Sequence, residues 1–167
     1  MPVVPVWAAC AVVLVGCIAV VCDVRTRRIP NALTAPALVL ALLAHGVLGG
    51  WADALRALGG VALAAAILAP GWLRGWMGAG DVKLMMAIGG WLAWPAALFA
   101  TLASLIAGGV IAVLVALRHR ALGPALRNAA ALAATPGNTA PRPLSGLRFP
   151  FATAIFAGSF IALWVRL

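Results

Sequence analysis

The sequence is poor in charged residues, and above all in acidic ones. Only 9% of its 167 residues are charged, and the acidic residues are Asp23, Asp53 and Asp81 alone. Because a water-soluble domain of this length carries about 25% charged residues, a soluble globule is close to excluded. Disorder is excluded too, since a chain that is 65% apolar cannot stay solvated. The composition therefore indicates an integral membrane protein.

The excess of basic residues needs a separate explanation. Twelve Lys and Arg residues against three acids give a net charge of +9. Nucleic-acid binding is the usual interpretation of a basic chain. Here the charges are few and lie between long apolar runs, which favours membrane orientation and no nucleic-acid partner.

Long charge-free runs predict the membrane-spanning helices. Such a helix needs about 20 apolar residues, because the hydrocarbon core is roughly 30 Å thick. The charge-free runs are residues 3–22, 29–52, 57–73, 84–117 and 149–165. The run 84–117 is too long for one span, and we expect it to break at Gly89-Gly90-Trp91 and Trp94-Pro95, leaving helices over 80–92 and 95–117. The prediction is an all-α protein with six transmembrane helices.

The distribution of basic residues predicts the orientation. With six spans in order, one side of the membrane receives ten Lys and Arg residues, and the other receives only Arg56 and Arg166. The side with more basic residues is the cytoplasmic one, so both termini are expected outside the cytoplasm. Residues 118–148 are predicted to be a basic cytoplasmic loop within a single membrane-embedded domain spanning 1–167.

Two of the three acids are predicted to lie at the same membrane surface. Asp23 ends the first span and Asp81 begins the fourth, so the alternation of spans brings both to one face, whereas Asp53 falls in a loop on the opposite face. Two close carboxylates share a proton and can activate water for hydrolysis without a metal or cofactor. Considered singly, Asp23 can also be explained by an ion pair with Arg27, and Asp81 as an acid at a helix N-terminus.

Two glycines precede the second acid. Gly78 and Gly80 precede Asp81, and glycine adopts backbone conformations closed to other residues and lets an extended chain approach closely. This arrangement suits an enzyme that places an unwound peptide beside a catalytic acid.

Three segments together carry a family resemblance. Residues 23–31 read Asp-Val-Arg-Thr-Arg-Arg-Ile-Pro-Asn, and residues 78–84 read Gly-Ala-Gly-Asp-Val-Lys-Leu. The last span opens with Arg-Phe-Pro-Phe at 148–151. The chain resembles the type IV prepilin peptidases, which are membrane aspartic peptidases of the Gly-x-Gly-Asp type.

The resemblance implies cleavage of a basic leader from a prepilin or pseudopilin at the cytoplasmic face of the bacterial inner membrane, in contact with membrane lipid. By the match, Asp23 and Asp81 are the catalytic pair. The resemblance also implies a role in the substrate channel, or in supporting the catalytic pair, for six further residues: Gly78, Gly80, Lys83, Pro30, Asn31 and Pro150. Because Lys83 lies two residues after Asp81 on a helix, we do not expect it simply to neutralise that carboxylate.

The sequence departs from the larger, bifunctional members of that family. Those carry paired, zinc-binding cysteines in an insertion before the first aspartate, and only one span precedes Asp23 here. Cys10, Cys17 and Cys22 form no Cys-x-x-Cys pair and are interpreted as small packing residues. Neither a zinc site nor methylation of the product is expected, and the chain is more similar to the short peptidases of tight-adherence or Flp pilus systems.

Other functions are compatible with parts of the sequence. A serine peptidase is disfavoured because no nucleophile motif surrounds Ser104, Ser145 or Ser159, and His45 is interpreted as a polar residue near a helix end. The main alternative is a small transporter, pore or assembly subunit whose aspartates handle cations or protons. The oligomeric state stays open.

Overall fold

The protein is all-helical in the part that the structure describes. A computed structural model describes residues 4–120, 123, 127 and 151–166. These residues form five helices and no strand; the helices are α1 (Val6–Thr26), α2 (Asn31–Leu73), α3 (Ala79–Leu92), α4 (Ala96–Arg118) and α6 (Phe151–Arg166). Most of the loop predicted at 118–148 lies outside the described residues, as does Pro150.

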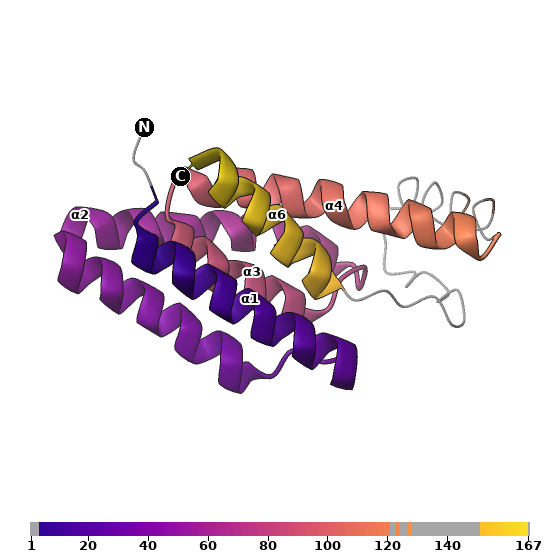
Figure 1. Ribbon diagram of the computed structural model, residues 1–167, viewed down its shortest axis with the longest axis horizontal. Coiled ribbons are helices and arrows are strands. Elements are labelled where there is room, and N and C mark those ends of the chain that lie inside the picture. The colour runs from indigo at the N-terminus through magenta and orange to yellow at the C-terminus, as the bar shows by residue number, and fades with distance from the viewer. Residues whose placement is uncertain (1–3, 121–122, 124–126, 128–150, 167) are drawn as a thin grey trace.

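Helix α2 contains both the second and the third predicted span. Its helical backbone is interrupted at Gly50, with φ of 76° and ψ of −173°. Such a positive φ is accessible to glycine at little cost, and Figure 1 shows α2 doubling back on itself. The reversal therefore lies at Gly50, and the prediction of a loop around Asp53 was wrong. Asp53 is helical and pairs with Arg56, one turn further on, over 2.7 Å.

The predicted break between α3 and α4 is present, but it is shorter than expected. The chain leaves the helical conformation between Ala93 and Pro95, so Gly89, Gly90 and Trp91 belong to α3 and were wrongly assigned to the turn. Gly89 packs directly against the backbone of Gly60 in α2. Because neither residue has a side chain, the two helices approach closely there.

Helix α3 is the centre of the bundle, with the other helices around it (Figure 1). Its Leu84, Met85 and Ile88 are among the largest fully buried side chains of the described residues. At about 21 Å for 14 residues, α3 is too short to cross a membrane unaided. The burial of α3 fixes where its first turn, which contains Asp81, lies.

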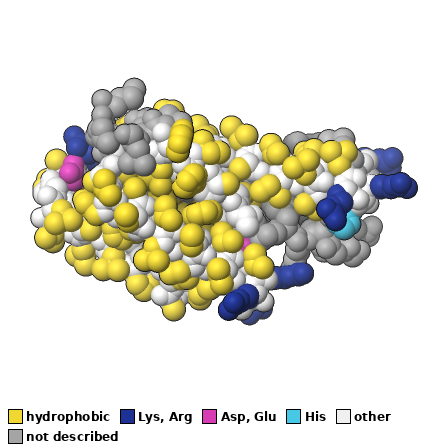
Figure 2. All heavy atoms as spheres, viewed as in Figure 1, with side chains coloured by type: hydrophobic (Ala, Val, Ile, Leu, Met, Phe, Trp, Pro, Cys, Tyr) yellow, Lys and Arg dark blue, Asp and Glu magenta, His cyan; other side chains and the backbone are white. Residues whose placement is uncertain are grey.

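Three helices are long and apolar enough to cross a membrane: α1, α2 and α4. Residues 151–164 of α6 form a shorter apolar helix. Large apolar side chains such as Val47, Ile106 and Trp164 are exposed on the outside. Hydrophobic side chains cover the left and middle of the molecule, and most of the visible Lys and Arg lie at its right end and lower right edge (Figure 2). This is the surface of an all-α membrane protein, while the count of six spans stays a prediction.

One interpretation of single residues was wrong, and His45 makes a contact that the sequence does not predict. Cys10 and Cys17 are exposed on α1, so they do not serve as packing residues of the core. His45 is buried, and its Nε2 lies 3.1 Å from the Trp91 carbonyl oxygen. Because a carbonyl only accepts, Nε2 donates this bond, while the His45 ring packs on Trp7 with centroids 4.9 Å apart. His45 thus ties the C-terminal end of α3 to α2.

Candidate active site

Asp23 lies in the last turn of α1. The helix ends at Thr26 because Arg27 adopts a left-handed φ of 53°, and its backbone N–H donates to the Asp23 carbonyl oxygen over 2.8 Å. Arg27 therefore caps the helix through its backbone. No ion pair joins the Arg27 and Asp23 side chains within the described residues, so that alternative explanation of Asp23 is wrong.

The Asp23 carboxylate contacts the last helix of the chain. The backbone N–H of Ala152, in the first turn of α6, donates to Asp23 Oδ2 over 3.3 Å. The N–H groups of a first helical turn have no partner within the helix, and they stabilise negative charge. The sequence does not predict this contact, since 129 residues separate the two partners and no spacing pattern joins them.

Asp81 lies in the first turn of α3, which is not one of the three helices long enough to span a membrane. Burial and the negative charge of Asp23 raise the pKa of Asp81 from 3.8 to about 6, and a hydrogen bond from the Gly78 backbone opposes this shift. The two carboxylates that the sequence places at one membrane surface are therefore close enough in the structure for one charge to act on the other.

The glycines before Asp81 provide space, not an unusual backbone. Gly78 has φ of −70° and ψ of 143°, which any residue adopts, so the prediction that its conformational freedom is needed was wrong. A Cβ at Gly78 would lie 3.1 Å from Asp81 Oδ2, and one at Gly80 would lie 3.3 Å from Ile29 Cβ. Glycine at both positions lets the start of α3 pack against the segment after Asp23 and leaves room for the Asp81 carboxylate.

A hydrogen bond joins the two motif segments. Lys83 Nζ donates to Asn31 Oδ1 over 2.9 Å, between the first turns of α3 and α2. Pro30 directly precedes α2, and its carbonyl oxygen accepts the backbone N–H groups of Leu33 and Thr34 over 3.0 and 3.3 Å. Lys83 thus positions the start of α3 against the start of α2, and it forms no ion pair with Asp81 within the described residues.

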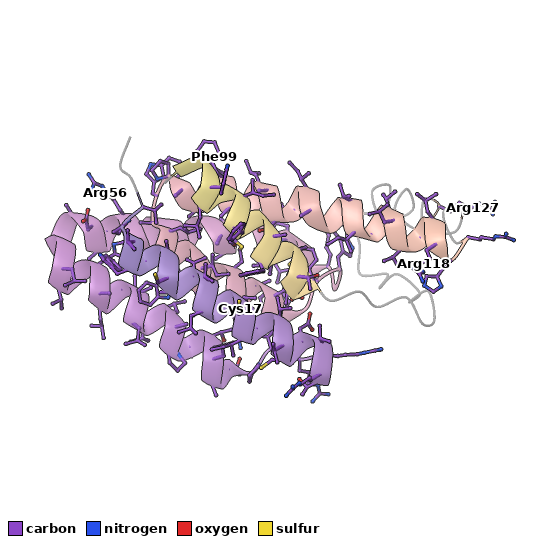
Figure 3. All side chains as sticks on the ribbon, in the orientation of Figure 1. Cys17, Arg56, Phe99, Arg118 and Arg127 are labelled. Atoms are coloured by element: carbon purple, nitrogen blue, oxygen red, sulfur yellow. The ribbon has the colours of Figure 1, made fainter. Side chains whose placement is uncertain are left out.

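The basic residues that lie near the two carboxylates in the sequence are exposed, whereas the carboxylates themselves are half-buried. Arg25, Arg27, Arg28 and Lys83 are all exposed. Asp53 pairs with Arg56 and is not among the groups that shift the pKa of Asp81. Figure 3 shows Arg56 at the end of the molecule opposite to Arg118. Asp53 is therefore separate from the pair formed by Asp23 and Asp81.

The arrangement has the chemical requirements of general acid–base catalysis. The Asp23 carboxylate accepts a hydrogen bond from the Ala152 N–H, and a pKa near 6 allows Asp81 to carry a proton in mildly acidic to neutral solution. Of the predicted site residues, the structure brings together Asp23, Asp81, Gly78, Gly80, Lys83, Pro30 and Asn31.

Comparison with known proteins gives one match. The model of the type IV leader peptidase family matches residues 10–113, which is more than half of the chain and includes both carboxylates. Searches of curated proteins and of solved structures found no match to this chain.

Proposed function

Because this chain belongs to the type IV leader peptidase family, we propose that it is a membrane aspartic endopeptidase that removes the basic leader of type IV prepilin-like precursors. The observation that carries the proposal is the electrostatic coupling between Asp23 and Asp81. These two acids occupy the aspartate positions of the two segments that resemble the family, and they meet at one end of the bundle although 58 residues separate them in the sequence.

In the proposed reaction, the two carboxyl groups move protons between water and the peptide bond. One carboxylate removes a proton from a water molecule, whose oxygen attacks the carbonyl carbon, while the protonated partner donates its proton to the carbonyl oxygen. The resulting diol then breaks its C–N bond. One carboxyl group protonates the leaving nitrogen and the other takes back a hydroxyl proton, so that peptide and water give one acid and one amine.

Neighbouring residues support this pair by setting its position. Lys83 and Asn31 connect the first turns of α3 and α2, and Gly80 packs against Ile29 next to them. Gly78 leaves space beside the Asp81 carboxylate, and Pro30 begins α2. In this proposal these neighbouring residues set the separation and orientation of the two carboxylates. Displacement of either carboxylate from its position lowers the rate of catalysis. Pro150 retains its predicted supporting role.

The proposed location follows from the apolar helices and the basic residues. Three helices can cross a membrane, and the end that carries the two carboxylates also carries Arg25, Arg27 and Arg28. Because basic residues concentrate on the cytoplasmic side, we place the pair at the cytoplasmic face of a bacterial inner membrane and both termini outside. A precursor whose apolar segment rests in the membrane would present its leader at this face.

Co-expression with candidate prepilins of the Flp type, followed by intact-mass measurement, tests the proposal. The expected product lacks the leader and carries no added methyl group at its new N-terminus. An unchanged precursor mass with every candidate, together with proton or cation flux through the purified protein in liposomes, would instead support a transporter.

A further inference from the structure

The chain turns back between α2 and α3 in a defined conformation. Just beyond the end of α2, Gly75 has a positive φ of 71°, which glycine adopts at little cost. The backbone N–H of Trp76 donates to the Gly71 carbonyl oxygen over 2.8 Å, and that of Gly75 donates to the Trp72 carbonyl oxygen over 2.9 Å. These two bonds form the Schellman motif that commonly ends a helix. They hold residues 72–76, which we call the Trp–Arg turn, in one arrangement.

The turn exposes a cation and large apolar side chains next to one another. Trp72, Leu73 and Trp76 are 47%, 70% and 46% exposed. The guanidinium group of Arg74 is also exposed, and its central carbon lies 5.2 Å from the centroid of the Trp76 ring. This cation–π contact restricts where the guanidinium can move, and the group has more N–H donors than such a contact occupies. The turn therefore presents an ordered hydrogen-bond donor of positive charge beside apolar surface.

The position of the turn along α2 indicates its depth in a membrane. Helix α2 is among those long and apolar enough to cross one, and its second half has an exposed tryptophan at each end, Trp51 and Trp72. About 32 Å of helix separates the two, close to the roughly 30 Å of a hydrocarbon core. Because tryptophan is enriched at both membrane interfaces, the Trp–Arg turn is expected at the level of the lipid headgroups.

The basic side chains of the protein far outnumber its acidic ones. Twelve Lys and Arg residues stand against three Asp residues in the whole sequence, so most of them have no acidic partner in the chain. Of those three acids, Asp53 is paired with Arg56. Because α2 doubles back, its two ends lie at one end of the bundle (Figure 1), and the exposed arginines of residues 25–28 are at the same end as Arg74. An anion at this end is attracted by several charges at once.

We propose that the Trp–Arg turn binds the headgroup phosphate of an anionic phospholipid, with Arg74 as the phosphate ligand. A guanidinium forms two parallel, charge-assisted hydrogen bonds with a phosphate group. The neighbouring arginines favour a headgroup of net negative charge over a zwitterionic one. Trp72 and Trp76 lie against the upper part of the lipid, where indole rings are most favourable. This interaction does not depend on the proposed peptidase function.

The apolar side chains of the turn favour a lipid over free phosphate as the ligand. A free phosphate ion would contact Arg74 alone and gain nothing from the exposed Trp72 and Leu73. A phospholipid places its phosphate and its acyl chains on the two kinds of surface that the turn offers. The bound lipid would also fix the depth of the segment that leads into α3.

The experiment measures lipid binding to the full chain by native mass spectrometry. The purified protein in detergent is titrated with phosphatidylglycerol or with phosphatidylcholine of the same acyl chains, and the ratio of the two dissociation constants is the preference for the anionic lipid. The variants of the turn are Arg74→Gln, Arg74→Lys and Trp76→Leu. The matched controls are Arg118→Gln, at the end of α4, and Trp164→Leu, which is exposed on α6. A further titration adds inorganic phosphate as competitor.

We expect the wild type to bind phosphatidylglycerol about tenfold more tightly than phosphatidylcholine. Arg74→Gln and Trp76→Leu should lose most of this preference, whereas both controls should retain it. Arg74→Lys should retain part of it, because lysine keeps the charge but not the planar pair of donors. Inorganic phosphate at the same concentration should not displace the lipid.

Three results would each overturn the proposal. The first is a wild type without preference for phosphatidylglycerol. The second is an equal loss of preference in Arg74→Gln and Arg118→Gln, which would mean that net charge alone attracts the lipid. The third is displacement of the lipid by inorganic phosphate, which would make the ligand an ion. Lipid binding is measured without a prepilin, so a failure of the proposed cleavage leaves this result unchanged.

Discussion

The ammonium group of Lys83 lies 2.9 Å from the side-chain oxygen of Asn31 and donates a hydrogen bond to it. The two residues are 52 positions apart, and each belongs to one of the two segments that carry an aspartate of the pair. Together with the contact between Gly80 and Ile29, this bond fixes how the start of α3 meets the chain after α1.

Loss of the bond between Lys83 and Asn31 should lower kcat for prepilin cleavage. We expect Lys83→Met and Asn31→Ala each to reduce kcat about tenfold with little change in KM, since both remove the same positioning contact. The double variant should be no worse than either single one, because residues that act through one contact are not additive. Multiplied losses in the double variant would mean that Lys83 acts on the substrate by itself.

The raised pKa of Asp81 predicts how thermal stability depends on pH. The folded protein holds a proton on Asp81 up to about pH 6, whereas the unfolded chain loses it near 3.8. The folded state therefore binds more protons between these values, and its stability falls as the pH rises through this window. Asp81→Asn carries no such charge, so the Tm of the variant relative to wild type should be higher at pH 7.5 than at pH 4.

Thermal unfolding of the detergent-solubilised proteins at several pH values measures this difference. Asp53→Asn is the matched control, because Asp53 is paired with Arg56 away from Asp81. A Tm difference between Asp81→Asn and wild type that is the same at pH 4 and pH 7.5 would contradict the assigned protonation of Asp81.

A side chain at Gly80 should lower kcat, and a larger side chain should lower it more. A Cβ there would lie 3.3 Å from Ile29 Cβ, so the start of α3 must move by a few tenths of an ångström in Gly80→Ala. We expect a severalfold lower kcat in this variant and near-complete loss in Gly80→Val, with normal membrane insertion.

Gly71→Ala serves as the control for Gly80→Ala, because a Cβ at Gly71 would meet nothing within 4 Å. The measurement is the initial rate of prepilin cleavage at equal amounts of folded protein. If Gly80→Val retained the wild-type rate, the packing of Gly80 on Ile29 would not be part of the site.

Local sequence patterns predicted the helix boundaries that depend on neighbouring residues in the chain. The helices expected over 80–92 and 95–117 correspond to Ala79–Leu92 and Ala96–Arg118, because hydrophobic length and a proline determine where such helices begin and end. The alternation of spans also placed Asp23 and Asp81 at the same end, since that result depends on the order of the helices alone.

Contacts between segments that are distant in the chain could not be predicted from the sequence. Nothing in the spacing of Asp23 and Ala152 reveals that α6 begins beside the carboxylate, because the position of α6 depends on how Phe156 and Gly158 pack. Likewise, the glycine that reverses α2 is Gly50, whereas the sequence predicted a loop around Asp53. Tertiary packing decides both questions.

The most direct test of the account is the cleavage of a purified prepilin by the three single variants Asp23→Asn, Asp81→Asn and Asp53→Asn, each reconstituted in lipid at equal amounts. We expect Asp23→Asn and Asp81→Asn to insert normally and to leave the precursor at full mass, and Asp53→Asn to cleave at close to the wild-type rate. Cleavage at the wild-type rate by either of the first two variants, or an equal loss in Asp53→Asn, would contradict the catalytic pair.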